Sequence, residues 1–201
     1  VRWGFVPRWA KDPSIGARMI NARAETLASR DAFRNAYARH RCLLPANGFY
    51  EWRATPSGKQ PMHIGMMDGQ PFGLGGLYER WLSPEGEVLD TCAIVTTAAS
   101  SSLRAMHDRM PVIVAPSDYR RWLDSSDPDV DDLLAASTDA LRVFPVSTRV
   151  NAVRNDDAEL CVPIDIASPS ASRRADDEGS HDAPLGDVHE QDDEPVQAQL
   201  F

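Results

Sequence analysis

The sequence lacks the features that would place it in a membrane or around a metal ion. It has no apolar run as long as the roughly 18 residues of a transmembrane helix, so we expect no membrane partner. Its cysteines, Cys42, Cys92 and Cys161, form no CxxC pair, and no HExxH motif occurs, so we expect no metal and no cofactor. Isolated cysteines in apolar runs are typical of buried side chains in a reducing cytoplasm, where we expect the protein to act.

Two other common signatures are also missing. The opening residues, Val1 to Phe5, contain no long apolar stretch, so we expect no signal peptide there. Gly73–Gly76 reads GLGG, but it lacks the GxGxxG spacing and no Lys-Ser/Thr follows, so neither nucleotide-binding fingerprint is met. These glycines instead predict a strand whose backbone packs closely against its neighbours.

Charge is present but unevenly distributed. The whole chain carries a formal charge of −9, yet residues 1–60 hold 11 Lys and Arg against 4 Asp and Glu. Residues 165–201 hold 2 against 10. An arginine-rich first third suits phosphate contacts, because guanidinium groups bind phosphate through two hydrogen bonds. A solvated basic face is the alternative interpretation.

The composition divides the chain into residues 1–165, a folded domain, and residues 166–201, an acidic tail. The tail has too few apolar side chains to offset the entropy cost of ordering, so we expect it to be disordered. In the domain, short strand patterns and turns alternate irregularly with helical patterns at 25–40, 116–123 and 129–136. This predicts an α+β fold: a curved, mostly antiparallel β-sheet or barrel core with flanking short helices, as a monomer.

Two side chains are candidates for proton transfer. Glu51 stands between Tyr50 and Trp52, and desolvation by aromatic rings raises the proton affinity of a carboxylate. His107 precedes Asp108 in a short link between a helical turn and a strand, and imidazole titrates near neutral pH. The alternative for Glu51 is an outward-facing residue of a half-exposed strand. The alternative for the segment at His107 is a local ion pair between Asp108 and Arg109.

Polar and aromatic residues of the first third suggest a nucleic-acid site. Asn21 and Arg23 precede a helical pattern, where they could orient a substrate oxygen and a phosphate, or simply belong to a helix cap. Trp3, Trp9 and Trp52 lie among the arginines, and such a mixture suits single-stranded nucleic acid, whose bases stack on aromatic rings. Core packing is the alternative for each tryptophan.

These pieces occur together, and in order, in one family. The chain resembles SOS-response-associated peptidase (SRAP) domains through WGFVPRWAKDP, INARAET, RCLLPANGFYEW, KQPMHI, TTAASSSLRAMHDRMPVIV and FPVSTRVNAVRNDDAELCVPI, which span residues 3–164. Several motifs in register make the resemblance specific. The resemblance does not extend to residues 165–201.

The resemblance implies an abasic-site processing enzyme that binds single-stranded DNA. The resemblance implies that the enzyme uses an N-terminal cysteine, which is exposed by autocatalytic removal of the initiator Met. Its amine attacks the aldehyde of an abasic site to give a Schiff base, and its thiol closes a thiazolidine, a covalent DNA–protein crosslink. The implied activities are therefore peptidase (hydrolase) and lyase-like.

The resemblance also implies roles for individual residues. Asn21 is similar to the asparagine that holds the abasic sugar, Glu51 to the acid or base for Met removal and crosslinking or its reversal, and His107 to the group that opens the sugar. The remaining residues are implied to contact DNA. Arg23 and Arg109 would bind phosphate, Trp9 and Trp52 would support bases or backbone, and Arg30, Arg34 and Arg41 would extend the groove.

The sequence departs from the family pattern at its start. The family opens with Met-Cys-Gly-Arg and several tens of residues before the motif found here at Trp3, and the three cysteines present are not N-terminal. We expect the true start to lie upstream of Val1 and to restore the cysteine; a catalytically inactive truncation is the alternative. Two other functions stay open, a non-covalent single-stranded DNA binding module and an unrelated hydrolase that uses Glu51 and His107.

Overall fold

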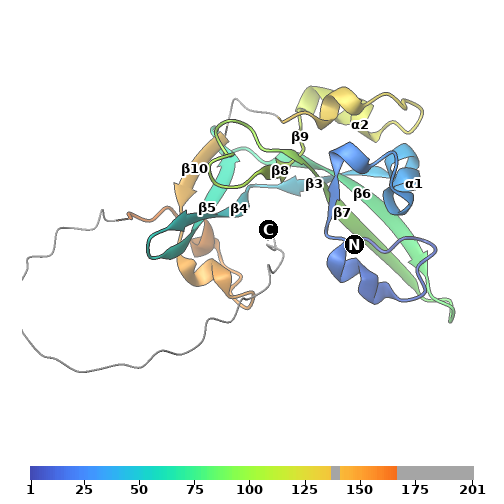
Figure 1. Cartoon of the computed structure of the whole chain (residues 1–201), viewed down its shortest axis with the longest axis horizontal. Coiled ribbons are helices and arrows are strands. Elements are labelled where there is room, and N and C mark those ends of the chain that lie inside the picture. The colour runs from blue at the N-terminus through green and yellow to red at the C-terminus, as the bar shows by residue number, and fades with distance from the viewer. Residues whose placement is uncertain (137–140, 167–201) are drawn as a thin grey trace, which may run out of the picture.

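The computed structural model describes residues 1–136 and 141–166, which form two β-sheets with short helices packed around them (Figure 1). The strands are β1 (Arg2–Trp3), β2 (Asn21–Arg23), β3 (Arg41–Ala46), β4 (Phe49–Thr55), β5 (Gly58–Met66), β6 (Phe72–Leu82), β7 (Val88–Ala98), β8 (Arg109–Pro111), β9 (Ile113–Val114) and β10 (Leu141–Pro145). The helices are α1 (Asp31–Arg39), α2 (Tyr119–Leu123) and the 3₁₀ helices Pro13–Arg18, Ala24–Thr26, Pro116–Asp118, Asp131–Leu134, Thr148–Asn151 and Ala158–Cys161.

The larger sheet has seven strands and is organised around β7. Strand β6 pairs antiparallel with β7 and β3, while the short strands β1 and β2 pair parallel with β7. Beyond the end of the β6 pairing, β8 pairs antiparallel with β7. Thr96 of β7 therefore lies between Arg23 of β2 and Pro111 of β8, so the register brings segments far apart in sequence to one place.

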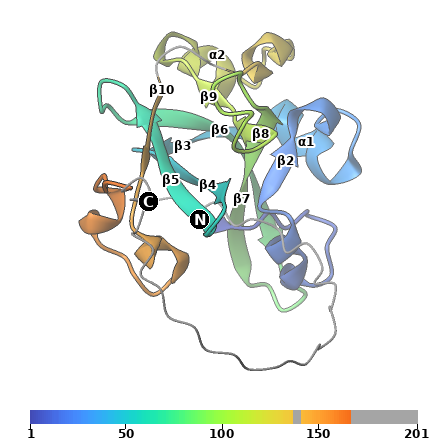
Figure 2. The same ribbon diagram turned by 60° about the vertical axis from the view of Figure 1, so that its left-hand side comes forward.

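The smaller sheet has three strands in the order β10, β5, β4, all antiparallel (Figure 2). One of its faces is covered by the segment of residues 147–161, through an apolar cluster of Tyr50, Val146, Val150 and Leu160. Strand β4 therefore has one face turned to this cluster and the other turned toward the larger sheet, where Phe49 joins a second apolar cluster.

Close packing explains the glycines of β6. A Cβ atom on Gly75 would lie 3.1 Å from the Trp122 ring, and one on Gly76 would lie 2.9 Å from a methyl carbon of Leu44. Gly73–Gly76 thus form a strand in tight contact with its surroundings, as the sequence predicted. The contact seats Trp122 of α2, which is fully buried, on the sheet.

The predicted α+β class with a curved, largely antiparallel sheet is confirmed, but the sheet does not close into a barrel: the described strands form two separate sheets. The helix expected at 25–40 begins only at Asp31, because Arg30 has extended backbone angles. The helix expected at 129–136 is only the 3₁₀ helix Asp131–Leu134, because Ala135 has extended backbone angles.

The proposed boundary after residue 165 stays a prediction, because most of the tail lies outside the described residues. In the part of the chain that is described, no helix combines the length and the apolar character needed to cross a membrane.

Candidate functional site

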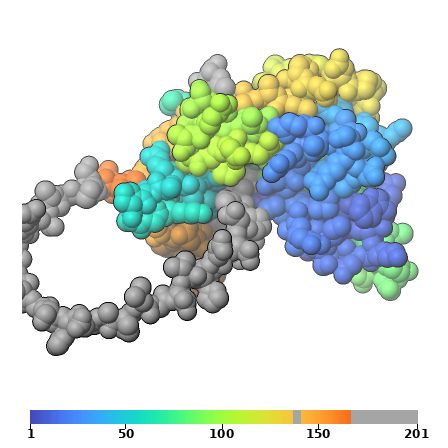
Figure 3. Space-filling model, viewed as in Figure 1, coloured from blue at the N-terminus to red at the C-terminus, as the bar shows by residue number. Residues whose placement is uncertain are grey.

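A pocket of about 390 Å³ opens where β2, β4, β7 and β8 meet. It gathers residues of both sheets and of the loop before β8. The lining residues are Arg18, Ile20, Asn21, Arg23, Arg30, Glu51, Ile94, Thr96, His107, Arg109, Met110 and Pro111. In the space-filling view, the β4–β5 hairpin (cyan) adjoins the segment before β8 (yellow-green), which in turn borders the N-terminal segments (blue) (Figure 3).

Strand β2 supplies one wall through its alternation. Ala22 is fully buried in the core, so Asn21 and Arg23 on either side of it are exposed and turned to the pocket. The pairing of Asn21 with Ile94 and of Arg23 with Thr96 fixes both residues against β7. Asn21 and Arg23, predicted from the INARAET motif, therefore both reach the pocket from β2. Arg23 is also the N-cap residue of the 3₁₀ helix Ala24–Thr26, but its side chain makes no capping hydrogen bond.

Glu51 enters the pocket from the opposite face of β4 to its aromatic neighbours. Tyr50 and Trp52 belong to the cluster beneath the smaller sheet, whereas Glu51 lines the pocket with 12% of its side chain exposed. Burial raises the pKa of Glu51 to about 7, although a positively charged His107 opposes the shift. A raised pKa of Glu51 was predicted from its aromatic neighbours, but Tyr50 and Trp52 lie on the other face of β4, so their rings do not cause the burial.

His107 lies close to Glu51. Its Nδ1 is 4.0 Å from Oε1 of Glu51 and 3.4 Å from Oδ1 of Asp108. The backbone N–H of Arg109 donates to the same Nδ1 at 3.1 Å. Nδ1 accepts this bond when it carries no proton. When Nδ1 carries a proton, it can donate to the carbonyl oxygen of Arg109, also 3.1 Å away.

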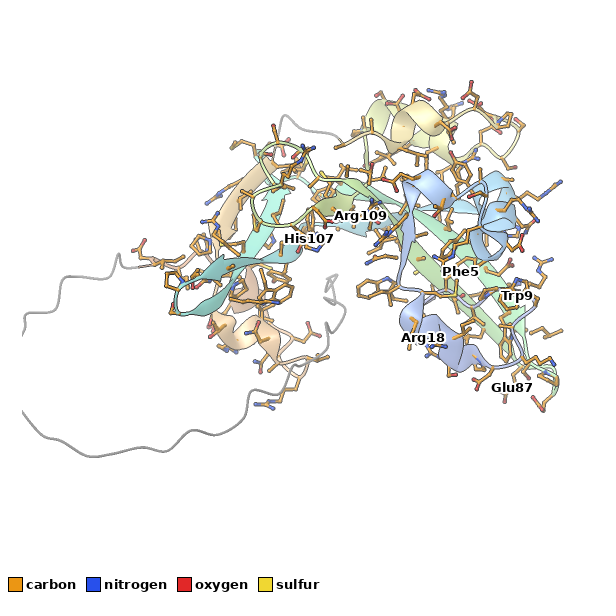
Figure 4. All side chains as sticks on the ribbon, in the orientation of Figure 1. Phe5, Trp9, Arg18, Glu87, His107 and Arg109 are labelled. Atoms are coloured by element: carbon orange, nitrogen blue, oxygen red, sulfur yellow. The ribbon has the colours of Figure 1, made fainter. Side chains whose placement is uncertain are left out.

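Arg109 lines the pocket, but its charge is already paired. Nη1 and Nη2 each donate to one carboxylate oxygen of Glu25 at 2.9 Å, and Nη2 also donates to the carbonyl of Thr96 at 2.6 Å. The pair keeps the pKa of Glu25 below its ordinary value. Figure 4 shows Arg109 beside His107 at the centre of the molecule.

Other predicted DNA contacts lie away from this pocket. Trp9 is 63% exposed on a separate surface with Arg8 and Asn35, and Figure 4 shows it apart from His107. Trp52 donates to Asn151 at 2.8 Å. Arg34 is exposed and pairs with Asp31. Of the outlying predictions, only Arg30 reaches the pocket lining.

Arg41, assigned by the resemblance to the basic groove, is in fact 6% exposed and belongs to the core. Its guanidinium donates to backbone carbonyl oxygens, those of Tyr37, Trp122, Asp124 and Asp127. A guanidinium with this set of acceptors is occupied by the fold and is not available to phosphate.

Several lining residues were missed by the sequence argument, chiefly Arg18 and Thr96. Arg18 ends the 3₁₀ helix Pro13–Arg18 and had only the arginine-rich composition as a signal. Thr96 lay inside a motif but had no chemical signal of its own. Within the described ranges, no group of three His, Cys, Asp or Glu side chains is arranged to hold a metal ion.

The arrangement suits proton transfer beside an anionic ligand. The pKa of Glu51 is about 7, so its carboxyl can exchange a proton with a ligand near neutral pH, and the imidazole of His107 lies 4.0 Å from it. Among the described residues, no ion pair neutralises Arg18, Arg23 or Arg30, so the wall keeps a positive charge. The Asn21 amide adds both a donor and an acceptor.

Comparison with known proteins gives a consistent result. The family model described as SOS response associated peptidase (SRAP) matches residues 1–153. The chain is 44% identical over 165 residues to the abasic site processing protein YoqW of Bacillus subtilis, covering 80% of this chain and 74% of that protein. It is 33% identical to the abasic site processing protein YedK of Escherichia coli, covering 82% and 74%.

A solved structure of a Bacteroides thetaiotaomicron protein has a TM-score of 0.74 and 28% identity, covering 81% of this chain and 75% of that one. Family model, sequence relatives and fold thus agree: the chain belongs to the SOS response associated peptidase (SRAP) family.

Proposed function

We propose that the chain binds single-stranded DNA in the pocket between its two sheets and processes abasic sites there. One observation carries the proposal: Glu51, with a pKa of about 7, lies 4.0 Å from His107 in a cavity lined by Arg18, Arg23 and Arg30. The names of the relatives, abasic site processing proteins, support the same substrate.

The pocket fits an abasic site on chemical grounds. Unpaired arginines attract the phosphates that flank the lesion, as backbone contacts do in single-stranded DNA binding. An abasic sugar lacks the base and interconverts with an open aldehyde, so the cavity needs a donor, an acceptor and a proton shuttle rather than a base-stacking surface. Asn21 would orient the sugar, and His107 would move the proton that ring opening requires.

The covalent step needs an amine and a thiol on one residue. We propose that an N-terminal cysteine supplies them: the amine adds to the aldehyde, water leaves as the Schiff base forms, and the thiol adds to close the thiazolidine. Glu51 would exchange the protons of these steps and of Met removal. Cys42, Cys92 and Cys161 do not line the pocket, and Cys42 has a pKa raised by burial to about 12.

A non-covalent single-stranded DNA binding module is the second candidate. The observation in its favour is that no thiol stands among the lining residues. The two candidates share the arginine wall and differ only in chemistry.

The test uses an oligonucleotide with one abasic site and the same oligonucleotide intact. The 201-residue chain should bind both, with an affinity that falls steeply as salt rises. A form of the protein that begins with the family's cysteine should give a slow-migrating adduct on a denaturing gel with the abasic strand only.

Binding without an adduct from the cysteine-bearing form would establish the second candidate and reject the first. Binding that ignores salt would reject both. Hydrolysis of a generic peptide in the absence of DNA would favour the unrelated hydrolase.

A further inference from the structure

Glu25 holds a pocket residue from outside the pocket. It lies in the 3₁₀ helix Ala24–Thr26 and is not part of the cavity lining, whereas its partner Arg109 is. Each carboxylate oxygen accepts from one guanidinium nitrogen at 2.9 Å, a fork-to-fork pair that fixes the plane of the guanidinium. The Arg109 side chain is 18% exposed and that of Glu25 is 53% exposed, so the pair borders the cavity.

The same guanidinium of Arg109 connects the segment after β2, through Glu25, with β7, through Thr96. Its contacts with Thr96, to the carbonyl at 2.6 Å and to Oγ1 at 3.4 Å, anchor it to β7. Thr96 lies between β2 and β8 in the register, so a bond from Glu25 to Arg109 joins the segment that follows β2 to the first residue of β8. The ion pair between Glu25 and Arg109 joins residues 84 positions apart in the sequence.

The backbone of Arg109 in turn fixes the ring of His107. Its N–H and its carbonyl oxygen each lie 3.1 Å from Nδ1, so one or the other partners the ring in either protonation state. A displacement of Arg109 would therefore change the orientation of the imidazole and its 4.0 Å separation from Glu51. Glu25, Arg109 and His107 form one chain of contacts.

We propose that Glu25 is a positioning residue for the abasic-site reaction, acting through Arg109 on His107. This inference rests on the proposed function. It divides the arginines into two groups. Arg109 is neutralised by Glu25 and sets geometry, while Arg18, Arg23 and Arg30 keep their charge and carry the affinity for phosphate.

The division predicts opposite effects of one substitution on binding and on rate. In Glu25→Gln, a negative charge at the pocket disappears and Arg109 is released toward the DNA. Single-stranded DNA should then bind as tightly as before or tighter, and the salt dependence should steepen by about 0.7 for the one added phosphate contact. The rate of adduct formation at saturating DNA should fall by about tenfold to a hundredfold, because His107 loses its orientation.

Two further variants separate positioning from loss of structure. Glu25→Asp keeps the carboxylate and should restore part of the rate. Glu87→Gln makes the same chemical change at the far tip of the β6–β7 hairpin (Figure 4) and should alter neither binding nor rate. A variant that merely unfolds would lose binding and rate together.

The experiment measures binding and NMR on the 201-residue chain, and adduct rate on the cysteine-bearing form. The ¹⁵N shifts of the neutral His107 ring should report one dominant tautomer in the wild type and a mixture of tautomers in Glu25→Gln. Unchanged shifts with an unchanged rate would overturn the role of Glu25, as would a parallel loss of affinity and rate in a variant whose NMR spectrum is that of a folded protein. Failure of the wild type to react would reject the proposed function instead, and the NMR comparison would still judge the contact chain.

Discussion

Two arginines of the basic first third are used in opposite ways. Arg41 is 6% exposed, and its guanidinium donates to four backbone carbonyl oxygens between α1 and the loop after α2. Arg23 is exposed at the pocket, and no ion pair within the described residues neutralises it. A cation with a full set of acceptors stabilises the fold, whereas one without them is left for a ligand.

Two buried carboxylates show the same contrast. Glu79 is 3% exposed and accepts from the guanidinium of Arg8 at 3.0 Å and from the backbone N–H of Arg80 at 3.1 Å. Glu51 is 9% exposed, and in the described part of the chain its carboxyl accepts no hydrogen bond. Burial without such partners raises the pKa of Glu51 to about 7, which makes it a proton carrier rather than a structural anion.

The largest expected effect is on chemistry. Glu51→Gln and His107→Ala should each lower a proton-dependent step by about a hundredfold or more, as loss of a general acid or base usually does. We expect His107→Ala to slow adduct formation and Glu51→Gln to impair Met removal or crosslink reversal. Gel assays of the cysteine-bearing form measure adduct formation and its reversal, and mass spectrometry of the same form expressed with a preceding Met measures Met removal. Wild-type kinetics in both variants would mean that Glu51 carries no proton in the reaction and does not differ in this respect from the structural carboxylate Glu79.

The next effect is on stability, at Arg41. Arg41→Met leaves four carbonyl oxygens without their donor and should lower the free energy of unfolding by about 3 kcal/mol or more. Arg34→Met removes an exposed pair with Asp31 and should cost less than about 1 kcal/mol. Urea unfolding of both variants gives the comparison. Equal costs would mean that Arg41 is no more part of the core than Arg34.

Substitution of Glu51 should change the free energy of unfolding by an amount similar to that at Arg41, but this change should depend on pH. Its pKa is about 7 in the folded protein and 4.5 ordinarily, so the folded state binds the proton more tightly. Its contribution to stability is present in full below pH 4.5 and is lost as the pH rises through 7. Glu51→Gln should therefore be more stable than wild type by up to about 3 kcal/mol at pH 8 and nearly equal at pH 4.

Thermal unfolding of Glu51→Gln and wild type at several pH values checks this difference. A constant difference across the range would contradict the raised pKa.

The smallest effect is expected for a single wall arginine. Arg23→Gln should weaken single-stranded DNA binding severalfold and reduce the slope of log affinity against log salt by about 0.7. Fluorescence anisotropy at several salt concentrations measures both. If the slope stays at its wild-type value, Arg23 does not contact phosphate, and the assignment of free arginines to DNA fails.

Much of the site could be predicted, and its supporting contacts could not. Asn21, Glu51 and His107 stand in recognisable motifs, and the structure brings them to one pocket. The bond between Glu25 and Arg109 depends on the register of β2 and β8 against β7, which no local pattern encodes. For the same reason, composition alone could not separate buried Arg41 from the arginines of the wall.

Trp9 illustrates a related limit. Its neighbourhood of arginines predicted a place in the DNA site, but the chain turns between it and β2, and Trp9 ends on another surface. Nearness in sequence to basic residues says little about which face of a sheet a side chain joins. The rings beside Glu51 show the same limit. Tyr50 and Trp52 are its neighbours in sequence, but alternation along β4 places them on the opposite face.

The central claim is that Glu51 is poised for proton transfer by burial beside His107. A ¹³C NMR titration of the Glu51 carboxyl tests it most directly. We expect a midpoint near pH 7 in the wild type and a higher one in His107→Ala, where the favourable charge is gone. A midpoint near 4.5, unmoved by His107→Ala, would contradict the account.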